Sequence, residues 1–292
     1  MWNKILSPML LSENDTVVVR DDYLYELKYD GMRVLIYVSP KSIKIISRNK
    51  KDVTYLFPEL NSIKELVNSK CIFDGEIICM DNDKISFSKL QERLHLKNTY
   101  KINNQSITNK ATFICFDIIY KNKDLTNLKL IERKKILDKI SDNDVFVKGF
   151  YVLKNGKKLF ESVKKLDMEG IVCKDINSIY EVGVRSKSWV KVKNIKSDYF
   201  YIGGYSYNEK ANVFSLYLGE YKDNNFYYVG KVFIAKKNNL FNELSKIHTK
   251  KNPFYDYDNN IQFVKVLNKV KIKYIERTKN NHLRQPFYDI NT

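Results

Sequence analysis

Short, mostly apolar stretches dominate the chain, and stretches of this length are typical of β-strands. Turn-forming residues separate the stretches. β-branched and aromatic side chains are enriched within them, which favours sheet over helix. In the first two thirds of the chain we predict five strands, of which the second and third form a hairpin: Tyr23–Leu27, Val34–Val38, Ile43–Ser47, Cys71–Met80 and Ala111–Tyr120.

Helical patterns are fewer. The clearest one spaces its apolar residues along one side of a helix, although the pattern is mixed. Four segments in this part of the chain are predicted to be helical: Pro58–Asn68, Ser86–Leu94, Leu130–Ile140 and Phe160–Leu166.

The pattern changes after Lys196, where nearly all of the remaining chain consists of short predicted strands around one short helix, Asn238–Ile247. About five strands with one inserted helix suggest a small β-barrel, and the OB-fold is the preferred architecture. The sequence therefore predicts two domains, residues 1–196 and 197–292. The strands of the second domain are Tyr199–Tyr207, Val213–Tyr221, Phe226–Val232 and Val264–Ile275.

The net charge of +17 comes from 51 basic and 34 acidic residues. Such an excess favours a polyanionic partner, namely nucleic acid, an anionic membrane surface or a phosphorylated ligand. Residues 197–292 contain 15 basic and 9 acidic residues, and residues 1–196 contain 36 and 25, so both domains could contact the same anion. The composition of an AT-rich genome is the alternative cause of the lysine excess.

The four cysteines lie in apolar runs without C-x-x-C spacing, and the chain has three histidines. We therefore expect buried thiols in a reducing compartment, and neither a zinc site nor a disulfide framework. The N-terminus lacks the features of a signal peptide, and no apolar run approaches the roughly 18 residues of a membrane span. These observations predict a cytoplasmic protein with no membrane contact.

Lys28 stands in the stretch Glu26-Leu27-Lys28-Tyr29-Asp30-Gly31-Met32-Arg33. A lysine amine attacks phosphorus only when it is neutral, and nearby cations favour the neutral form. Gly31 permits a close approach of the backbone to a ligand, and the planar fork of Arg33 suits a phosphate. The alternative is a surface turn in a lysine-rich chain.

Later strands place charged residues among apolar ones, where burial of a charge is unfavourable without a partner. Asp74 and Glu76 lie in one such strand, and Asp117 is expected to end another strand in a cleft. Lys191 and Lys193 share one face of a strand and repel each other unless an anion lies between them. We predict that a nucleotide phosphate is this anion. For each motif alone, an ordinary structural role is the alternative.

Six motifs follow one another along the chain: Lys28-x-Asp30-Gly31-x-Arg33, Ser47-Arg48, Asp74-Gly75-Glu76, Phe116-Asp117, Glu169-Gly170-Ile171-Val172-x-Lys174 and Trp189-x-Lys191-x-Lys193. This ordered set resembles the covalent nucleotidyltransferases, specifically the ATP-dependent DNA ligases. Further segments look like the ligase module of bacterial end-joining ligases, among them Phe57-Pro58-Glu59-Leu60 and Leu90-Gln91-x-Arg93. The resemblance implies an α+β nucleotidyltransferase (adenylation) domain followed by an OB-fold domain.

The resemblance also implies a role for each motif residue in binding ATP. Lys28 would attack the α-phosphorus, release pyrophosphate and carry AMP. The other residues would surround the nucleotide as follows: Glu26 and the peptide of Leu27 at the adenine amine, Phe116 stacked on adenine, Glu76 at the ribose, Arg33 and Arg48 at phosphate and ribose, and Lys174, Lys191 and Lys193 at the α-phosphate. Glu169 would hold a magnesium or manganese ion.

AMP would then pass to the 5′-phosphate at a nick in double-stranded DNA, and the 3′-hydroxyl would expel it. Arg48 and Arg185 would contact the DNA phosphate. We expect a monomer acting in repair or end joining, alone or with a DNA end-binding protein. The family's last motif, Arg-x-Asp-Lys, does not occur after Leu283-Arg284-x-Pro286, so we expect less efficient formation of lysyl-AMP. Two alternatives stay open: an RNA ligase or capping enzyme, and a nucleic-acid-binding protein with impaired self-adenylylation.

Overall fold

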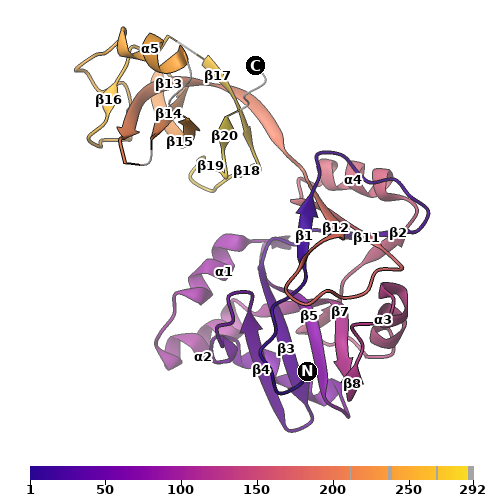
Figure 1. The fold of residues 1–292 in the computed structure, drawn as a ribbon. Helices are drawn as coiled ribbons and strands as arrows, with labels where there is room; N and C mark the ends of the chain where they lie inside the picture. Colours follow the sequence, from indigo (N-terminus) through magenta and orange to yellow (C-terminus); the bar gives the residue numbers. More distant parts are fainter. Residues whose placement is uncertain (211, 236–238, 268, 289–292) are drawn as a thin grey trace. The chain divides into compact units, whose positions relative to one another are not determined.

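The computed structural model describes residues 1–210, 212–235, 239–267 and 269–288 (Figure 1). The chain divides into two compact units, Met1–Lys193 and Asn194–Thr292. The sequence prediction places its boundary at residue 196, close to this division. The last four residues lie outside the described residues, as does the first residue of the predicted helix Asn238–Ile247.

The first unit, every residue of which is described, contains two sheets. The larger sheet has the order β4-β3-β5-β7-β8, with β6 on β5 and β9 on β7. The smaller sheet has the order β1-β12-β11-β2-β10. Their strands are β1 (Leu10–Glu13), β2 (Tyr23–Leu27), β3 (Met32–Ser39), β4 (Ser42–Ser47), β5 (Cys71–Asp81), β6 (Lys84–Ile85), β7 (Ala111–Lys121), β8 (Lys123–Asp124), β9 (Phe146–Lys148), β10 (Tyr151–Leu153), β11 (Gly170–Asp175) and β12 (Arg185–Lys193).

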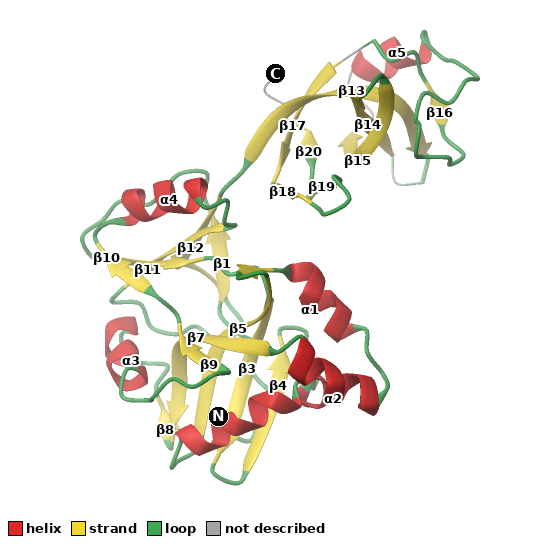
Figure 2. Ribbon diagram, turned by 180° about the vertical axis from the view of Figure 1, so that it is seen from behind, coloured by secondary structure: helices red, strands yellow, loops and turns green. Residues whose placement is uncertain are grey.

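Six helical segments surround these sheets: η1 (Thr54–Leu56), η2 (Pro58–Leu66), α1 (Phe87–Leu94), α2 (Thr99–Thr108), α3 (Leu130–Leu137) and α4 (Gly156–Lys165). Figure 2 shows α1 and α2 beside the larger sheet and α4 along the smaller one. The five predicted strands of this unit are confirmed, and so is the hairpin of β3 and β4. The four predicted helices are also present, although Pro58–Leu66 is a 3-10 helix.

Alternation along the strands decides into which of two cores each side chain is buried. In β3, Val34, Ile36 and Val38 enter a core shared with the helices, whereas Leu35 and Tyr37 point to the opposite face. That second face packs against Leu24 and Trp189 of the smaller sheet. The two sheets therefore face each other, and the polar residues of these inner faces share one environment.

Helix α2 is absent from the sequence prediction. Its residues, Thr99–Thr108, include two asparagines and two isoleucines besides threonine at both ends, so its intrinsic helix propensity is low. The Asn98 side chain accepts a hydrogen bond from the Lys101 backbone and caps the first turn. Ile102 is buried in the core beneath the helix, so tertiary packing stabilises what local propensity does not.

The second unit is built on β13 (Lys196–Asn208), β14 (Val213–Lys222), β15 (Asn225–Ala235) and β17 (Lys269–Tyr274), with α5 (Asn239–Ser245) between them. The sheet order is β15-β14-β13-β17-β20, with β16 on β13. Since β20 also contacts β15, the sheet closes toward a small barrel, and the α+β fold class with an OB-fold module is confirmed. The shorter strands are β16 (Gln262–Phe263), β18 (Glu276–Arg277), β19 (Leu283–Arg284) and β20 (Phe287–Tyr288).

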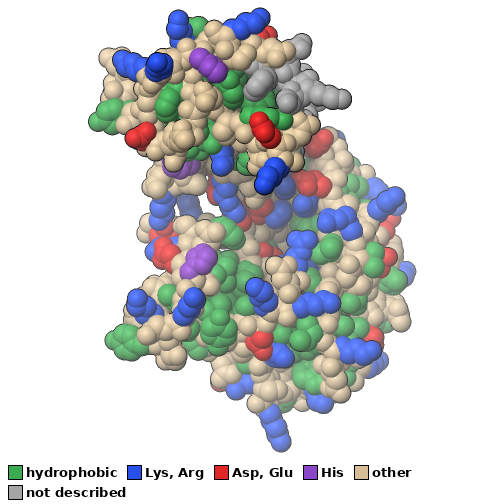
Figure 3. All heavy atoms as spheres, turned by 60° about the vertical axis from the view of Figure 1, so that its left-hand side comes forward, with side chains coloured by type: hydrophobic (Ala, Val, Ile, Leu, Met, Phe, Trp, Pro, Cys, Tyr) green, Lys and Arg blue, Asp and Glu red, His purple; other side chains and the backbone are tan. Residues whose placement is uncertain are grey.

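All four cysteines are buried free thiols, as predicted. Lys and Arg side chains are scattered over the face seen in Figure 3 rather than gathered in one patch, in line with the even spread of charge along the sequence. Among the described residues, none of the helices combines the length and apolar character needed to cross a bilayer.

One buried ion pair fastens the helices to the larger sheet. Arg93 of α1 contacts both carboxylate oxygens of Glu59 in η2, at 2.7 and 3.1 Å. Arg93 also donates to the carbonyl of Leu56, while Glu59 accepts the backbone N–H of Ala111 at the start of β7. The Arg93 side chain has no exposed surface, so its charge depends on Glu59.

Glu59→Gln removes the negative charge from this pair and leaves the Arg93 guanidinium buried. We expect the free energy of unfolding to fall by about 3–5 kcal/mol, measured by urea denaturation. Asp144→Asn is the matched control, because its pair with Lys110 is exposed; it should change stability by less than about 1 kcal/mol. Equal effects of the two substitutions would contradict the buried-pair argument.

Candidate functional site

The smaller sheet presents polar residues on its inner face and apolar residues on its outer face. Val172 of β11 lies in register between Glu26 of β2 and Lys191 of β12, and Lys174 lies opposite Trp189. Residues of the alternate positions form a separate core against α4: Tyr23, Tyr25, Ile171, Cys173, Val190 and Val192. Period-two alternation therefore delivers the motif residues of three strands to the same face.

Lys28 follows β2 directly, and its backbone N–H donates to the carbonyl of Gly170 at 2.9 Å. Its Nζ lies 2.7 Å from Oε1 of Glu169, and both side chains are mostly buried. Gly170 has φ of +154°, and a Cβ there would lie 2.2 Å from the carbonyl oxygen of Val192. Only glycine fits between β11 and β12 at this point, which fixes Glu169 beside Lys28.

At Gly31 the lack of a side chain allows close packing within the protein. A Cβ at this position would lie 2.2 Å from the carbonyl oxygen of Ile77 and 2.8 Å from Cγ of Glu76. The residue therefore lets the chain after Lys28 press against β5, and it brings the Lys28 segment close to Glu76.

Glu26 is almost fully buried and is held by two lysines. Its Oε1 accepts from Nζ of Lys134 and its Oε2 pairs with Nζ of Lys174, each at 2.5 Å. Burial alone would raise the pKa of Glu26, but the two ammonium groups outweigh burial and lower it. Leu27, which ends β2, pairs with Ile171. Lys134 lies in α3, a helix that the sequence predicts, but it is not among the predicted site residues.

Phe116 is the extra residue of a β-bulge, because Asp74 pairs with Asp117 while Gly75 pairs with Cys115. The Lys174 Nζ lies 4.4 Å from the centre of the Phe116 ring and 4.0 Å from that of Trp189. Burial lowers the pKa of Lys174 to about 8, although the Glu26 carboxylate opposes this shift. Lys174 thus sits with Glu26 and the aromatic rings, apart from the paired lysines of β12.

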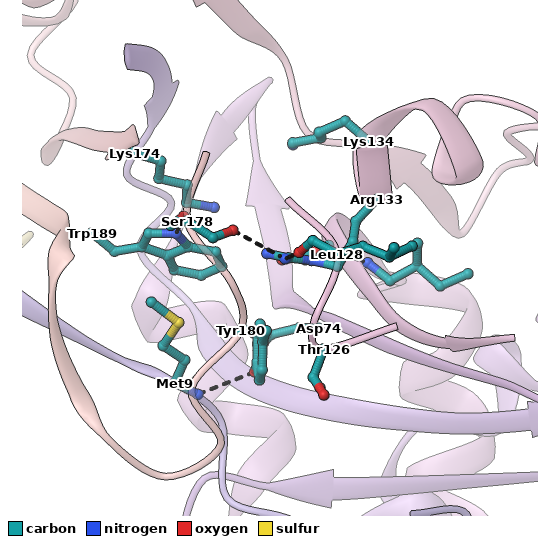
Figure 4. A network of polar contacts seen from close by, with 12 residues as sticks. Met9, Asp74, Thr126, Leu128, Arg133, Lys134, Lys174, Ser178, Tyr180 and Trp189 are labelled. Atoms are coloured by element: carbon teal, nitrogen blue, oxygen red, sulfur yellow. Dashed lines mark hydrogen bonds and ion pairs between the residues drawn. The ribbon is translucent and has the colours of Figure 1, made fainter. Parts of the chain in front are cut away.

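Arg33 uses its planar fork on a protein carboxylate. Its Nε and Nη2 donate to the two oxygens of Asp74 at 3.0 and 2.7 Å. The Tyr180 hydroxyl donates to the same carboxylate at 2.6 Å and accepts the backbone N–H of Met9 (Figure 4). Asp74 is therefore a structural anchor with three fixed contacts, and it holds Arg33 above the Phe116 ring.

The expectation that Asp117 ends its strand in a cleft is wrong. Asp117 is fully buried and forms a bidentate pair with Arg133 of α3, at 2.8–3.2 Å. Arg133 also donates to the carbonyls of Leu128 and Ser178, the latter being part of the network in Figure 4. The pair joins α3 to the larger sheet and leaves no surface for a ligand.

Lys191 and Lys193 do have an anion between them, but the protein supplies it. Oε2 of Glu13 in β1 lies 2.9 Å from Nζ of Lys191, and Oε1 lies 3.0 Å from Nζ of Lys193. The Glu13 side chain is 45% exposed, whereas each lysine is about half as accessible. The two lysines thus share one anion, as the strand pattern predicts, and in this structure that anion is the Glu13 carboxylate. Binding of a nucleotide phosphate at the same place stays a prediction.

Glu76 pairs in register with Arg33 across β3 and β5, and its carboxyl group is partly buried. It forms no hydrogen bond or ion pair with the described residues. Burial raises the pKa of Glu76 to about 8, which Lys28 and Arg33 oppose and Glu169 reinforces. Glu76, Glu169 and Lys28 thus lie close enough for their charges to interact.

The two arginines predicted to reach DNA are both exposed. Arg48 lies in the turn after β4 and its side chain has no partner within the described residues. Arg185 begins β12 and donates to the carbonyl of Leu11. Over the described ranges there is no group of three or more His, Cys, Asp or Glu side chains that would form a metal site by itself.

Residues 8–193 match the family model for the ATP dependent DNA ligase domain. The multifunctional non-homologous end joining protein LigD of Mycolicibacterium smegmatis is 28% identical over 296 residues, covering 96% of this chain and 37% of that protein. A DNA ligase of Pyrobaculum neutrophilum is 33% identical over 176 residues, covering 58% of this chain and 30% of the relative. The matched region thus spans about a third of the length of these curated relatives.

Solved structures of DNA ligases are also similar to this chain. The crystal structure of the ligase domain from M. tuberculosis LigD aligns with a TM-score of 0.59 and 25% identity, over 97% of this chain and 93% of that one. A Lig E DNA ligase aligns with a TM-score of 0.66 and 15% identity, over 97% and 98% of the two chains. The second likeness shows the fold alone.

The raised pKa of Glu76 predicts a pH-dependent stability. Between about pH 4.5 and 8 the folded protein keeps the Glu76 proton while the unfolded chain releases it, so stability falls as pH rises through this window. Glu76→Gln, which mimics the protonated group, should match the parent at pH 4.5. By pH 8.5 it should be more stable by at least about 1 kcal/mol, measured by urea denaturation. Glu161→Gln on the exposed face of α4 is the control, and a gain that is equal at both pH values would count against the assignment.

Proposed function

Because the chain belongs to the ATP-dependent DNA ligase family, we propose that it is an enzyme that seals nicks in double-stranded DNA and that Lys28 carries the AMP. The observation that carries this proposal is the position of Lys28, paired with Glu169 and next to a face with a built oxyanion site, Lys191 and Lys193. A nucleophile, a carboxylate and two phosphate-binding cations are the parts that phosphoryl transfer requires.

In the first step the Lys28 Nζ attacks the α-phosphorus of ATP, an N–P bond forms and the P–O bond to pyrophosphate breaks. The pair with Glu169 favours the ammonium form of Lys28, so a proton has to leave before the attack. Lys191 and Lys193 would hold the α-phosphate where they now hold the Glu13 carboxylate. Their two positive charges would then offset the charge that grows on the phosphate oxygens.

The remaining residues would bind the nucleoside and tune the pocket. Phe116 would stack on adenine, which requires the Lys174 ammonium to leave the ring. Glu26 and the peptide of Leu27 would read the adenine amine, which requires one of the lysine contacts of Glu26 to open. Glu76 would accept a ribose hydroxyl, and Arg33, which is fixed by Asp74, would face phosphate and ribose with the nitrogen that Asp74 does not use.

A magnesium or manganese ion fits the carboxylates of Glu169 and Glu76. Glu76 has no partner among the described residues, its pKa is raised to about 8, and Glu169 lies near it. Two carboxylates are a small set, but Mg²⁺ commonly takes one or two protein carboxylates and completes its shell with water and substrate phosphates. Such an ion would neutralise phosphate charge and would draw Glu169 away from the Lys28 ammonium.

In the second step a 5′-phosphate oxygen at the nick would attack the phosphorus of lysyl-AMP and break the P–N bond. In the third, the 3′-hydroxyl would attack the 5′-phosphorus and release AMP. The exposed guanidinium groups of Arg48 and Arg185 would position the DNA backbone. We place the enzyme in the bacterial cytoplasm or nucleoid, as a monomer in break repair. The likeness to LigD, named for non-homologous end joining, supports an end-binding partner.

Incubation with α-phosphate-labelled ATP and Mg²⁺ tests the nucleophile. We expect a labelled protein whose bond is acid-labile and alkali-stable, as a phosphoramidate is, and we expect Lys28→Ala to abolish the label. Lys51→Ala, an exposed lysine outside the site, is the control. Label retained by Lys28→Ala would remove Lys28 as the nucleophile, and labelling by GTP alone would exclude the ATP-dependent ligase function.

Glu13→Gln tests the oxyanion site. The substitution removes the resident anion while keeping the shape of the side chain, so ATP phosphates no longer compete with it. We expect the Kd for a non-hydrolysable ATP analogue to fall by up to about fivefold, since a half-exposed ion pair contributes at most about 1 kcal/mol. Calorimetric titration measures the Kd, with Glu161→Gln as the control, and an unchanged or weaker affinity would show that Glu13 does not compete with phosphate.

A further inference from the structure

The second unit carries a hollow of about 520 Å³ between the tip of the β14–β15 hairpin and the segment that follows α5. Its size is in the range of pockets that accept small organic ligands. None of the residues of the phosphoryl-transfer site contributes to it. Its lining mixes aromatic, amide and lysine side chains and includes no Asp or Glu among the described residues.

Four aromatic side chains are among the residues that line the hollow. Phe226 and Phe254 are buried and stack with ring centres 5.0 Å apart and planes inclined by 23°. Tyr221 lies 5.0 Å from the Phe226 ring and is 54% exposed, and Tyr255 is 68% exposed. The backbone N–H of Tyr255 donates to the Phe226 carbonyl at 2.7 Å. Two exposed tyrosine side chains therefore lie at the buried Phe226–Phe254 stack, Tyr221 through a ring contact and Tyr255 through its backbone.

Positive charge and hydrogen-bonding groups surround these rings. Lys251 and Lys265 line the hollow, are exposed, and form no ion pair with the described residues. The side-chain amides of Asn224 and Asn225 also lack partners there. The nearest carboxylate along the chain from Tyr255, that of Asp256, accepts the Tyr228 backbone N–H at 2.9 Å. The lining thus combines uncompensated cations with amides that can both donate and accept.

We propose that this hollow binds an unpaired DNA nucleotide, such as a base of a single-stranded overhang at a DNA end. A base offers a π-face to Tyr221 or Tyr255, a polar edge to the asparagine amides and a phosphate to the lysines. A paired base inside a duplex keeps its faces stacked on its neighbours and cannot enter, so the hollow selects unpaired nucleotides. The choice of DNA over RNA rests on the proposed ligase function.

A fluorescent ten-nucleotide oligo(dT) tests the inference, with its affinity for the full chain measured by anisotropy. We expect the Tyr221→Ala/Tyr255→Ala double variant to bind at least about tenfold more weakly. The Tyr221→Phe/Tyr255→Phe variant keeps the ring faces and should bind like the parent. Tyr199→Ala is the matched control, because this tyrosine is 59% exposed in the same unit and does not line the hollow.

The lysines are tested by the salt dependence of the same binding. Lys251→Gln/Lys265→Gln should reduce the slope of log K against log salt concentration by roughly one to two. Lys246→Gln, an exposed lysine beyond the end of α5, should leave the slope nearly unchanged. Thermal unfolding of each variant checks that the fold is intact.

Formation of lysyl-AMP on Lys28 is measured in parallel, and the hollow variants should keep it. Failure of adenylylation in the parent protein would overturn the proposed function and leave oligonucleotide binding to be judged on its own. Parent-like oligo(dT) affinity in the double alanine variant, or an equal loss in Tyr199→Ala, would overturn the present inference while leaving the ligase proposal intact.

Discussion

Every charged side chain between the two sheets of the first unit needs an opposite charge, because removing an ion from water is far costlier than any single contact is favourable. Glu26 shows the constraint most clearly, since it is buried and takes a lysine on each oxygen. Asp74 and Asp117 obey it through Arg33 and Arg133. These pairs fix the relative position of strands and helix α3, so the geometry of the site and the stability of the fold share one cause.

The pairs fall into two groups that differ in burial. The first group is buried and holds helices against the larger sheet. It consists of the pairs Asp117–Arg133 and Glu59–Arg93. The second group keeps some exposed surface, so a ligand can replace one partner. It consists of the pair of Lys28 with Glu169 and the contacts of Glu13 with Lys191 and Lys193. A phosphate entering between the two lysines of β12 would leave their charge balance unchanged, because one anion takes the place of another. If the nucleotide binds as proposed, the two lysines would need no other change of position than the exchange of one anion for another.

Apolar runs rich in β-branched and aromatic residues were sufficient to predict the main strands of the first unit. The period of two along residues 189–193 was sufficient to assign Lys191 and Lys193 to one face. These local patterns could not identify Glu13, Lys134 or Tyr180. They lie 178, 108 and 106 residues away in sequence from their partners Lys191, Glu26 and Asp74. Such contacts depend on how two sheets pack, and no local pattern encodes that. The prediction for Asp117 was wrong for the same reason. The sequence around an acidic residue in an apolar strand is the same whether its side chain faces a cleft or a buried partner such as Arg133.

The β-bulge places the Phe116 ring beside the Lys174 ammonium group. If adenine stacks on this ring as proposed, it displaces the Lys174 ammonium, which otherwise remains bound to Glu26. Burial already lowers the pKa of Lys174 to about 8, so the neutral amine is accessible near physiological pH and the displacement need not strand a buried charge. Glu26 would keep Lys134 on one oxygen and turn the other to the adenine amine. The same carboxylate would thus stabilise the empty pocket and read the base in the occupied one.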